Sequence, residues 1–338
     1  MLTGTVLAQE ANFYRVRLER EDPGRILLCT RRARLKKTGQ TVYTGDTVSL
    51  TEVDWQGGRA AIADILPRRS LLARPPIANC TAVLVVAALS EPPYDPVLMS
   101  RFLVCVATEG LPAHVCLTKR DEVDEATVEA TLRQVRGWGY PATAVSAASA
   151  AGIDELVSVL AGGVWVLAGA SGAGKSSLIN ALKPGLDLRV GEISDRLGRG
   201  RHTTRHVELF ELPGPALVAD APGFNQLELT FPPDALDEYF PEFRPLSASC
   251  QFRDCLHREE PGCAVRSADL ERYSIYRTFL EETLVYDQKR RARSEPDAVL
   301  KSVGRRRIPR LDGQYRQTSR RLSRQQLDQW NGEGAEED

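Results

Sequence analysis

The first 66 residues follow the pattern of short strands separated by turn residues. Strand-like runs lie at residues 4–10, 13–19, 25–30, 44–53 and 59–66. Gly, Asn, Asp and Pro residues stand between these runs, as is usual in the turns that connect strands. Five short strands in a span of this length predict a small β-barrel, which we place at residues 1–68.

From about residue 78 the pattern changes to apolar strand-sized runs that alternate with helical patterns. The strand-sized runs lie at 81–89, 113–119, 164–169 and 216–220. Helical patterns lie at 96–110 and 125–139, and another begins at Gly174. Strands and helices in alternation build a mostly parallel sheet that helices cover. We therefore expect an α/β domain over residues 69–233.

The remainder of the chain divides into a cysteine-containing segment, 234–290, and a tail, 291–338. The segment has a helical pattern over 267–288, whereas the Arg-rich tail has few large apolar residues and is expected to dock on a partner or to stay mobile. No apolar run reaches the roughly 18 residues of a membrane span, and the first residues have the pattern of neither a secretory signal nor a transit peptide. The expectation is a cytoplasmic protein that begins at Met1 and makes no membrane contact.

The formal net charge of −1 is the sum of segments with opposite charges. The 338 residues are 42% hydrophobic and 26% charged, which suits a globular chain. Residues 1–70 carry a net charge of +4 and residues 289–324 one of +10, whereas residues 71–249 carry −7. Two basic segments that flank an acidic domain suit an RNA partner, because phosphates attract Lys and Arg. In both segments, charges that are merely solvated are the alternative.

A glycine-rich stretch after the 164–169 strand fits the phosphate-binding pattern G-x-x-x-x-G-K-[ST]. It comprises Gly169, Ala170, Ser171, Gly172, Ala173, Gly174, Lys175 and Ser176, and Ser177 follows it. Backbone N–H groups of such a loop surround phosphate oxygens at the N-terminus of a helix, whose partial positive charge attracts them. We expect Lys175 to reach the β- and γ-phosphates and the Ser176 hydroxyl to bind Mg²⁺. A Gly/Ser-rich loop without this role is the alternative.

Two further segments can complete a site for a nucleotide and Mg²⁺. Asp220 ends the 216–220 strand, where a carboxylate can hold Mg²⁺ through its water ligands, and the Gly223 N–H can meet the γ-phosphate. Thr203 and Thr204 lie in a Gly/Arg-rich loop that can close over the ion and the γ-phosphate, and the spacing does not decide which of them coordinates Mg²⁺. Asp-x-Pro-Gly is also a common turn, which is the alternative for residues 220–223.

A short motif at the end of the 113–119 strand resembles the base-reading element N/T-K-x-D of GTPases. It consists of Thr118, Lys119, Arg120 and Asp121. The carboxylate of Asp121 would accept hydrogen bonds from guanine N1–H and the exocyclic amine, whereas adenine has an acceptor at N1 and would leave it unpaired. Ser146 and Ala147 would supply a backbone N–H for guanine O6. The motif favours GTP over ATP, and a kinase or ATPase is the weaker alternative.

Three cysteines and a histidine lie within 14 residues of the cysteine-containing segment. Their order is Cys250-x4-Cys255-x-His257-x5-Cys263. Three thiolates and one imidazole complete the tetrahedral shell of one Zn²⁺ ion with no open position, which is typical of a structural site. The ion would stabilise a segment too small to fold alone. A cluster without metal is the alternative.

The order of these motifs is that of a circularly permuted domain, because the base reader precedes the phosphate loop instead of following it. With the Cys-Thr-Arg-Arg-Ala-Arg-Leu-Lys and Thr-Gly-Asp patterns at 29–36 and 44–46, the chain closely resembles the ribosome small subunit-dependent GTPase A family (RsgA, also called YjeQ) over essentially its whole length. The predicted fold is α/β: a circularly permuted P-loop GTPase domain with an N-terminal all-β OB-fold barrel and a C-terminal zinc-binding helical domain.

The resemblance implies a GTP hydrolase that is a late assembly or maturation factor of the small (30S) ribosomal subunit. As a monomer, it would bind 16S rRNA through its barrel and zinc domains, and the subunit would stimulate hydrolysis, which drives release. Phe13, Tyr14 and the basic residues at 31–37 suit base stacking and phosphate contact. Residues 220–230 lead directly into the zinc domain, so their movement can reach it. The alternative is an rRNA-binding module in which nucleotide is mainly structural.

Three positions, 118, 205 and 224, depart from what the family or other GTPases commonly have. Residue 224 is Phe where many GTPases have a water-orienting Gln, and the resemblance suggests His202 for this role, beside Lys175 and Thr204. A surface imidazole is the alternative for His202. The family often has Asn where Thr118 stands, so Thr118 would replace only part of an amide contact that braces the phosphate loop. Arg205 follows Thr204 where the family commonly has a further Thr.

Overall fold

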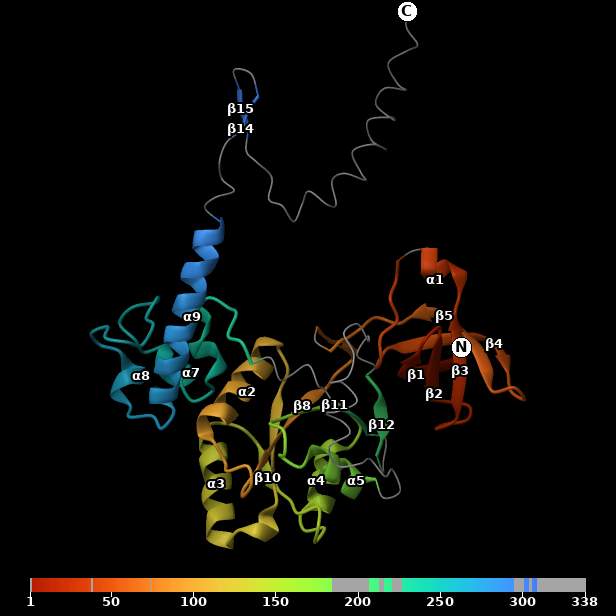
Figure 1. The fold of residues 1–338 in the computed structure, drawn as a ribbon, viewed down its shortest axis with the longest axis horizontal. Helices are drawn as coiled ribbons and strands as arrows, with labels where there is room; N and C mark the ends of the chain where they lie inside the picture. Colours follow the sequence, from red (N-terminus) through yellow and green to blue (C-terminus); the bar gives the residue numbers. More distant parts are fainter. Residues whose placement is uncertain are drawn as a thin grey trace, which may run out of the picture. The chain divides into compact units, whose positions relative to one another are not determined.

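The computed structural model describes most of the chain up to Ser294 and two short strands beyond it (Figure 1). The described residues are 2–37, 39–73, 75–183, 207–212, 216–220, 227–294, 301–303 and 306–308. The chain divides into two compact units, one of Met1–Glu228 with Asp237–Tyr276 and the other of Leu229–Leu236 with Arg277–Asp338. The barrel, the main sheet and the four predicted metal ligands all belong to the first unit.

The N-terminal strands form a closed barrel in the order β1-β2-β3-β5-β4. They are β1 (Leu2–Glu10), β2 (Phe13–Leu18), β3 (Ile26–Arg31), β4 (Thr47–Asp54) and β5 (Arg59–Ile65), with helix α1 (Ala33–Lys37) between β3 and β4. Apolar side chains from all five strands fill the interior, where Val16, Leu27 and Ile62 are fully buried. The barrel confirms the predicted all-β N-terminal domain.

Two aromatic residues at the start of β2 point to opposite sides of the barrel wall, because successive side chains of a strand alternate between its faces. Phe13 is 41% exposed, whereas Tyr14 is 4% exposed and belongs to the barrel core. The expectation that Tyr14 stacks on RNA bases is therefore wrong. Phe13 is the member of the pair that a base can reach.

The α/β domain is built on a six-stranded sheet in the order β10-β9-β8-β11-β13-β12. Its strands are β8 (Ala82–Ala88), β9 (Ala113–Thr118), β10 (Ala142–Ala144), β11 (Val164–Ala168), β12 (Leu209–Glu211) and β13 (Leu217–Asp220). Neighbouring strands are parallel, except that β12 runs antiparallel to β13 at one edge. A short hairpin of β6 (Leu71–Leu72) and β7 (Ile77–Ala78) lies between the barrel and β8 in the chain.

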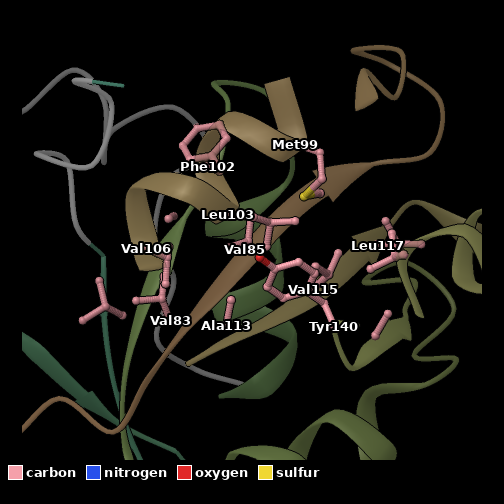
Figure 2. Packing of buried hydrophobic residues seen from close by; sticks show 14 of the residues in the cluster. Val83, Val85, Met99, Phe102, Leu103, Val106, Ala113, Val115, Leu117 and Tyr140 are labelled. Atoms are coloured by element: carbon pink, nitrogen blue, oxygen red, sulfur yellow. The ribbon is translucent and has the colours of Figure 1, made fainter. Parts of the chain in front are cut away.

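Helices cover both faces of this sheet. They are α2 (Pro96–Thr108), α3 (Glu125–Gly137), α4 (Ile153–Leu160) and α5 (Lys175–Leu182), and η1 (Arg120–Glu122) is a short 3-10 turn. On one face, Phe102 and Leu103 of α2 pack in the same cluster as Val83 of β8 (Figure 2). On the other face, Leu84 and Val86 of β8 share a cluster with α4 and α5. Because successive residues of β8 face different helices, the strand is apolar throughout.

The cysteine-containing segment consists of short turns and helices followed by one long helix. Its elements are η4 (Asp237–Tyr239), α7 (Arg244–Ser247), α8 (Ala264–Ser267) and α9 (Tyr273–Ser294). From Arg277 onward α9 belongs to the second unit, as do η3 (Pro233–Ala235), β14 (Lys301–Val303) and β15 (Arg306–Ile308). The helix expected over 267–288 begins only at Tyr273, because Asp269 has a left-handed backbone (φ 47°) that interrupts it. Within the described ranges, no helix is both long and apolar enough to cross a membrane.

A buried arginine fastens the cysteine-containing segment to the α/β domain. Arg272 is 1% exposed and donates two hydrogen bonds to Glu242, from Nε to Oε1 at 2.6 Å and from Nη2 to Oε2 at 2.5 Å. Its Cζ atom also lies 4.9 Å from the ring centroid of Trp138 and 4.6 Å from that of Phe240. Since a buried guanidinium is costly without such partners, these contacts hold the segment against the C-terminal end of α3.

His114 on β9 makes the stability of the domain depend on pH. Burial, and after it the charge of Arg136, lowers the pKa of His114 from 6.5 to about 4. Between these two values the unfolded chain binds a proton that the folded chain does not, so stability falls as the pH drops through this window. We expect the loss of unfolding free energy between pH 7 and pH 5 to be about 2 kcal/mol smaller in His114→Gln, measured by denaturant titration. Equal losses in both proteins would contradict this assignment.

Candidate functional site

A glycine-rich loop joins β11 to the N-terminus of α5. Its glycines at 169, 172 and 174 have φ angles of 145°, 80° and 85°, a region that favours glycine. A Cβ on Gly169 would lie 2.1 Å from the carbonyl oxygen of Val86, so a side chain there would collide with the backbone of β8. Gly174 precedes the first residue of α5, whose N-terminus carries a partial positive charge. The loop therefore has the backbone of a phosphate-binding turn.

The side chain of Lys175 folds back over this loop. Its Nζ donates hydrogen bonds to the carbonyl oxygens of Gly169 at 2.9 Å and Ala170 at 2.8 Å. Ser176 and Ser177 follow in the first turn of α5 and are half-buried. An ammonium group and a helix N-terminus at one loop provide the charge and the N–H donors that bind a phosphate.

Thr118 connects the base-reading motif directly to the glycine-rich loop. Its hydroxyl lies 2.7 Å from the carbonyl oxygen of Ala173 and 3.3 Å from that of Ala87. Because a hydroxyl has only one proton to donate, the shorter contact is the stronger hydrogen bond. The side chain is 4% exposed, so water does not compete for this bond. Thr118 thus supplies one brace to the loop where an asparagine amide would offer two donor hydrogens.

We expect Thr118→Val, which removes the hydroxyl and keeps the shape of the side chain, to weaken GTP binding about five- to tenfold. The reason is that the Ala173 carbonyl loses its hydrogen bond while it remains buried. Thr118→Ser is the matched variant, since it keeps the hydroxyl and should bind GTP within about twofold of the unchanged protein. Titration with a fluorescent GTP analogue measures both. Unchanged affinity in Thr118→Val would show that the brace does not contribute.

The rest of the base-reading motif forms a short turn at the end of β9. Lys119 has a left-handed backbone (φ 59°), and its Nζ donates a hydrogen bond to the carbonyl oxygen of Glu91. The guanidinium of Arg120 donates to both carboxylate oxygens of Glu125 at 3.0 Å. These contacts fix the turn, and Asp121 within it is exposed. Its carboxylate is therefore accessible to a base.

The turn with Ser146 lies beside this motif. The Val145 N–H donates to the Leu117 carbonyl at 2.7 Å, and the Arg120 N–H donates to the Val145 carbonyl at 3.3 Å. Ser146 is buried, and its hydroxyl oxygen accepts a hydrogen bond from the Ser149 N–H at 3.0 Å, which holds the turn in shape. The structure thus brings together the two segments that the sequence assigns to guanine, and Ala147 is half-buried.

A loop that the sequence analysis did not single out also borders the site. It runs from the end of β8 to the start of α2, over residues 89–95. The Ser90 hydroxyl donates to Glu122, Lys119 donates to the Glu91 carbonyl, and the ring of Pro92 lies 3.4 Å from where a Cβ on Gly172 would stand. The loop therefore contacts both the base-reading motif and the glycine-rich loop. The run Ser-Glu-Pro-Pro-Tyr-Asp-Pro after an apolar strand is the signal that could have pointed to it.

These segments all follow the carboxyl ends of neighbouring parallel strands. The glycine-rich loop follows β11, Thr118 ends β9, Ser146 follows β10, and Asp220 ends β13. In an open α/β sheet the carboxyl ends of parallel strands meet at one edge, where ligands bind. The edge is thus a single candidate site for a nucleotide.

Several residues with predicted roles lie outside the described ranges. They are His202, Thr203, Thr204 and Gly223. Asp220 is placed by its backbone as the last residue of β13. The roles of these residues as Mg²⁺ ligands, γ-phosphate contacts and catalytic groups stay predictions.

The four predicted metal ligands form one cluster in the cysteine-containing segment. The ligand atoms of Cys250, Cys255, His257 and Cys263 all lie within 4.8 Å of one another. The His257 Nδ1 atom is 3.6 Å from the Cys250 sulfur and 3.4 Å from the Cys263 sulfur. Three sulfurs and one imidazole nitrogen at this separation fit a tetrahedral metal ion of the size of zinc. The cluster can therefore hold a metal.

The surroundings of the cluster fix how its histidine would bind. The other ring nitrogen of His257, Nε2, is 3.4 Å from a carboxylate oxygen of Asp237 and 3.3 Å from the Ser247 hydroxyl. A carboxylate at this nitrogen keeps its proton there and leaves Nδ1 free to be a ligand. At Cys263, burial raises the pKa, but the Arg266 N–H and the His257 imidazole outweigh it and hold the pKa below its ordinary value. This favours the thiolate, which is the form that binds metal.

Comparison with known sequences agrees with this geometry. The RsgA GTPase family model matches residues 65–230. The protein named small ribosomal subunit biogenesis GTPase RsgA from Trichormus variabilis is 45% identical, over 96% of this chain and 96% of the relative. The protein of the same name from Microcystis aeruginosa is 47% identical, over 89% of this chain and 84% of the relative.

Two solved structures share the fold. YjeQ from Thermotoga maritima is 31% identical with a TM-score of 0.71, and the match covers 84% of this chain and 98% of that one. YloQ, described as a circularly permuted GTPase, is 32% identical with a TM-score of 0.70, covering 84% of this chain and 95% of that one. These matches confirm the predicted permutation and the prediction of a GTP-hydrolysing enzyme. With relatives this similar over nearly its whole length, the chain belongs to the RsgA GTPase family.

Proposed function

We propose that the chain hydrolyses GTP as a late assembly or maturation factor of the small (30S) ribosomal subunit. The observation that carries the proposal is the 2.7 Å contact between Thr118 Oγ1 and the Ala173 carbonyl, because it joins a guanine-reading motif to a phosphate-binding loop in one domain. The names of two relatives support the ribosomal role, since both are small ribosomal subunit biogenesis GTPases.

In this proposal the edge of the sheet binds guanine at one end and phosphates at the other. Asp121 accepts the two hydrogen bonds of the guanine edge, and the backbone near Ser146 and Ala147 donates to O6. The glycine-rich loop and Lys175 hold the β- and γ-phosphates. The exposure of Asp121 and the position of the Lys175 ammonium over the loop support these roles.

Two metal ions belong to the proposal. Mg²⁺ binds with GTP, held by the Ser176 hydroxyl and by Thr203 or Thr204, and it neutralises phosphate charge during hydrolysis. Zinc is the metal of the cysteine cluster, where Cys250, Cys255, His257 and Cys263 fill its four positions and leave none for catalysis. The close approach of the four ligand atoms supports a structural ion there.

The barrel and the zinc-binding segment supply the contacts with 16S rRNA. Two aromatic side chains of the barrel, Phe13 and Trp55, are each 41% exposed and can stack on unpaired bases. The basic stretch at 31–37, and the tail at 291–338, can neutralise phosphates. In this proposal the protein works in the cytoplasm as a monomer, exchanging GTP and GDP, and hydrolysis releases it from the subunit.

Co-sedimentation with small ribosomal subunits tests the ribosomal part of the proposal. With a non-hydrolysable GTP analogue, we expect binding that weakens steeply as the salt concentration rises, because Lys and Arg contacts with phosphates release counterions. Large subunits serve as the matched control and should not bind under the same conditions. Binding to both subunits alike, or to neither, would refute a role in biogenesis of the small subunit.

GTP and ATP competition tests the base-reading part separately. We expect GTP to displace a fluorescent guanine nucleotide at least about a hundredfold better than ATP does, and Asp121→Asn to reduce this preference. The rival view, in which an RNA-binding module uses nucleotide only to stabilise its fold, is not favoured, because the family model and the relatives are those of GTPases.

A further inference from the structure

A β-bulge in the barrel directs one apolar side chain out of the barrel. The pairing of β1 with β2 shifts register between Val6 and Ala8, which leaves Leu7 unpaired. Leu7 is 3% exposed, but it packs in the cluster of the α/β domain that contains Val207 and Leu209, and not in the barrel core. Bulges commonly re-aim a side chain in this way. The barrel thus contributes a residue to the core cluster of the α/β domain.

Two arginines of β2 pair with acidic residues at the same place. Arg15 and Arg17 lie on the outer face of the strand, since the residues that flank them point inward. The guanidinium of Arg15 pairs with Glu208, and the Arg17 Nε atom is 3.4 Å from a carboxylate oxygen of Glu211. Ala8 of β1 also forms an antiparallel bridge with Glu208. Backbone and side chains of the barrel therefore contact Glu208, just before β12, and Glu211, its last residue.

The Thr-Gly-Asp turn that marks the barrel sequence belongs to the same contact. The Thr44 hydroxyl donates to the Val207 carbonyl at 3.1 Å. A Cβ on Gly45 would lie 2.1 Å from the Ala78 carbonyl oxygen, so only glycine fits between the barrel and β7. Asp46 is fully buried and accepts from the Arg68 Nε at 2.6 Å. These contacts hold the turn in place. The Thr44 hydroxyl connects it to Val207, two residues before β12.

The position of β12 in the chain connects this contact to the segments predicted to bind Mg²⁺ and the γ-phosphate. The strand follows the loop with Thr203 and Thr204, and it pairs with β13, which ends at Asp220. The two segments proposed to contact Mg²⁺ and the γ-phosphate are therefore both connected along the chain to the strand pair β12–β13. Packed side chains and ion pairs with few alternative arrangements can carry coupling between distant sites.

We propose that Leu7, Arg15, Arg17 and Thr44, with residues 207–211, form a clamp through which subunit contact at the barrel controls GTP hydrolysis. The clamp residues are positioning residues: they set the place of β12 and touch no nucleotide. The inference rests on the proposed function in that the small subunit is the ligand of the barrel. By thermodynamic linkage, the same clamp makes the affinity for the subunit depend on the bound nucleotide.

A charge exchange between Arg15 and Glu208 tests the clamp. The variants are Arg15→Glu, Glu208→Arg and the double exchange, and Glu10, which also lies 3.0 Å from Arg15, is kept in all of them. Arg20→Glu is the matched control, since it makes the same charge change at an exposed arginine of the barrel that lies between β2 and β3, outside the clamp. Single-turnover GTP hydrolysis is measured without and with saturating small subunits, and subunit affinity is measured with GDP and with a GTP analogue.

We expect each single variant to hydrolyse GTP alone within about twofold of the unchanged rate and to lose about tenfold in stimulation by the subunit. The ratio of the two subunit affinities should shrink as well, because the nucleotide and the subunit influence each other's binding through the same contacts. The double exchange should restore most of both quantities, since it re-forms the ion pair with opposite polarity, while the retained Glu10 then faces a carboxylate at position 15. The control Arg20→Glu should keep the stimulation of the unchanged protein.

Two results would overturn the clamp while leaving the proposed function intact. One is full stimulation in both single variants; the other is a double exchange that stays as low as the singles, which would mean that Arg15 acts by touching RNA. Absence of stimulation in the unchanged protein would instead refute the proposed function and the clamp together. If Arg15→Glu does not fold, Thr44→Val replaces it, since it removes only the hydroxyl donated to Val207, and a loss of about threefold is then expected.

Discussion

Replacement of Lys175 by alanine is expected to lower the single-turnover rate of GTP hydrolysis at least about a hundredfold. The ammonium group is the cation placed over the glycine-rich loop, 2.9 Å from the Gly169 carbonyl and 2.8 Å from that of Ala170. When GTP binds, the same group can turn to the β- and γ-phosphates and stabilise the charge that develops on them. Alanine removes this cation.

Lys183→Ala is the matched control for this substitution. Lys183 follows the last residue of the same helix, α5, and so lies about two turns away from the loop. Its removal changes the net charge equally and should leave the rate within about twofold of the unchanged protein. A Lys175→Ala protein that binds and hydrolyses GTP as the control does would contradict the assignment of the phosphate site.

Removal of the metal is expected to unfold the cysteine-containing segment. Zinc bound by three thiolates and an imidazole contributes on the order of 10 kcal/mol to the folding of a small domain, which is comparable to the whole stability of a typical one. Without the ion, three thiols and His257 lie within 4.8 Å of one another and lose the metal–ligand bonds that would join them. We expect Cys263→Ser, or treatment with a chelator, to release about one equivalent of zinc and to open residues 237–276 to proteases.

Cys105→Ser is the control for the loss of zinc. This thiol lies on α2, partly buried against the main core, and burial raises its pKa to about 11, so it is neither a ligand nor reactive. The variant should retain its zinc and its protease resistance. Zinc analysis by mass spectrometry, with limited proteolysis in parallel, gives both readouts. A Cys263→Ser protein with full zinc content, or one that stays resistant without metal, would contradict the structural role.

The parts of the fold that the sequence predicts are those decided by local pattern. In β8, an apolar run of strand length next to a helical pattern is enough to indicate a strand buried on both faces. The glycine-rich loop is predicted for the same reason, because Gly169, Gly172 and Gly174 at their spacing already require backbone angles that only glycine accepts readily. The metal ligands lie within one short stretch, so their proximity follows from the chain itself.

The features that the sequence does not predict depend on contacts between residues far apart in the chain. The sequence pattern predicts Leu7 as an ordinary residue of a barrel strand. Only the bulge in β1 places its side chain in the core cluster that also contains Val207. Tyr14 and Phe13 are adjacent aromatics, and the register of β2 decides which of them is buried. Arg272 would be read as a surface charge, yet it is buried against Glu242, thirty residues earlier. Tertiary packing determines which of these side chains are buried and what they contact, and the local sequence pattern does not contain that information.

The buried arginine also bears on the hypothesis that the nucleotide site is linked to the cysteine-containing segment. The sequence suggests a route along residues 220–230, directly from the Asp-Ala-Pro-Gly turn into the segment. The structure adds a second connection, in which Arg272 packs on Trp138 and Glu271 accepts a hydrogen bond from the Trp138 indole at 3.0 Å. Trp138 follows the last residue of α3, so this connection ties the segment to the end of α3 opposite the base-reading motif.

Single-turnover GTP hydrolysis with and without small ribosomal subunits tests the central claim most directly. The account predicts slow hydrolysis by the protein alone and a rate at least about tenfold higher with small subunits, while large subunits leave the rate unchanged. The stimulated rate should also fall with rising salt, as binding weakens. Equal rates with and without small subunits, at concentrations where binding is saturated, would contradict the account.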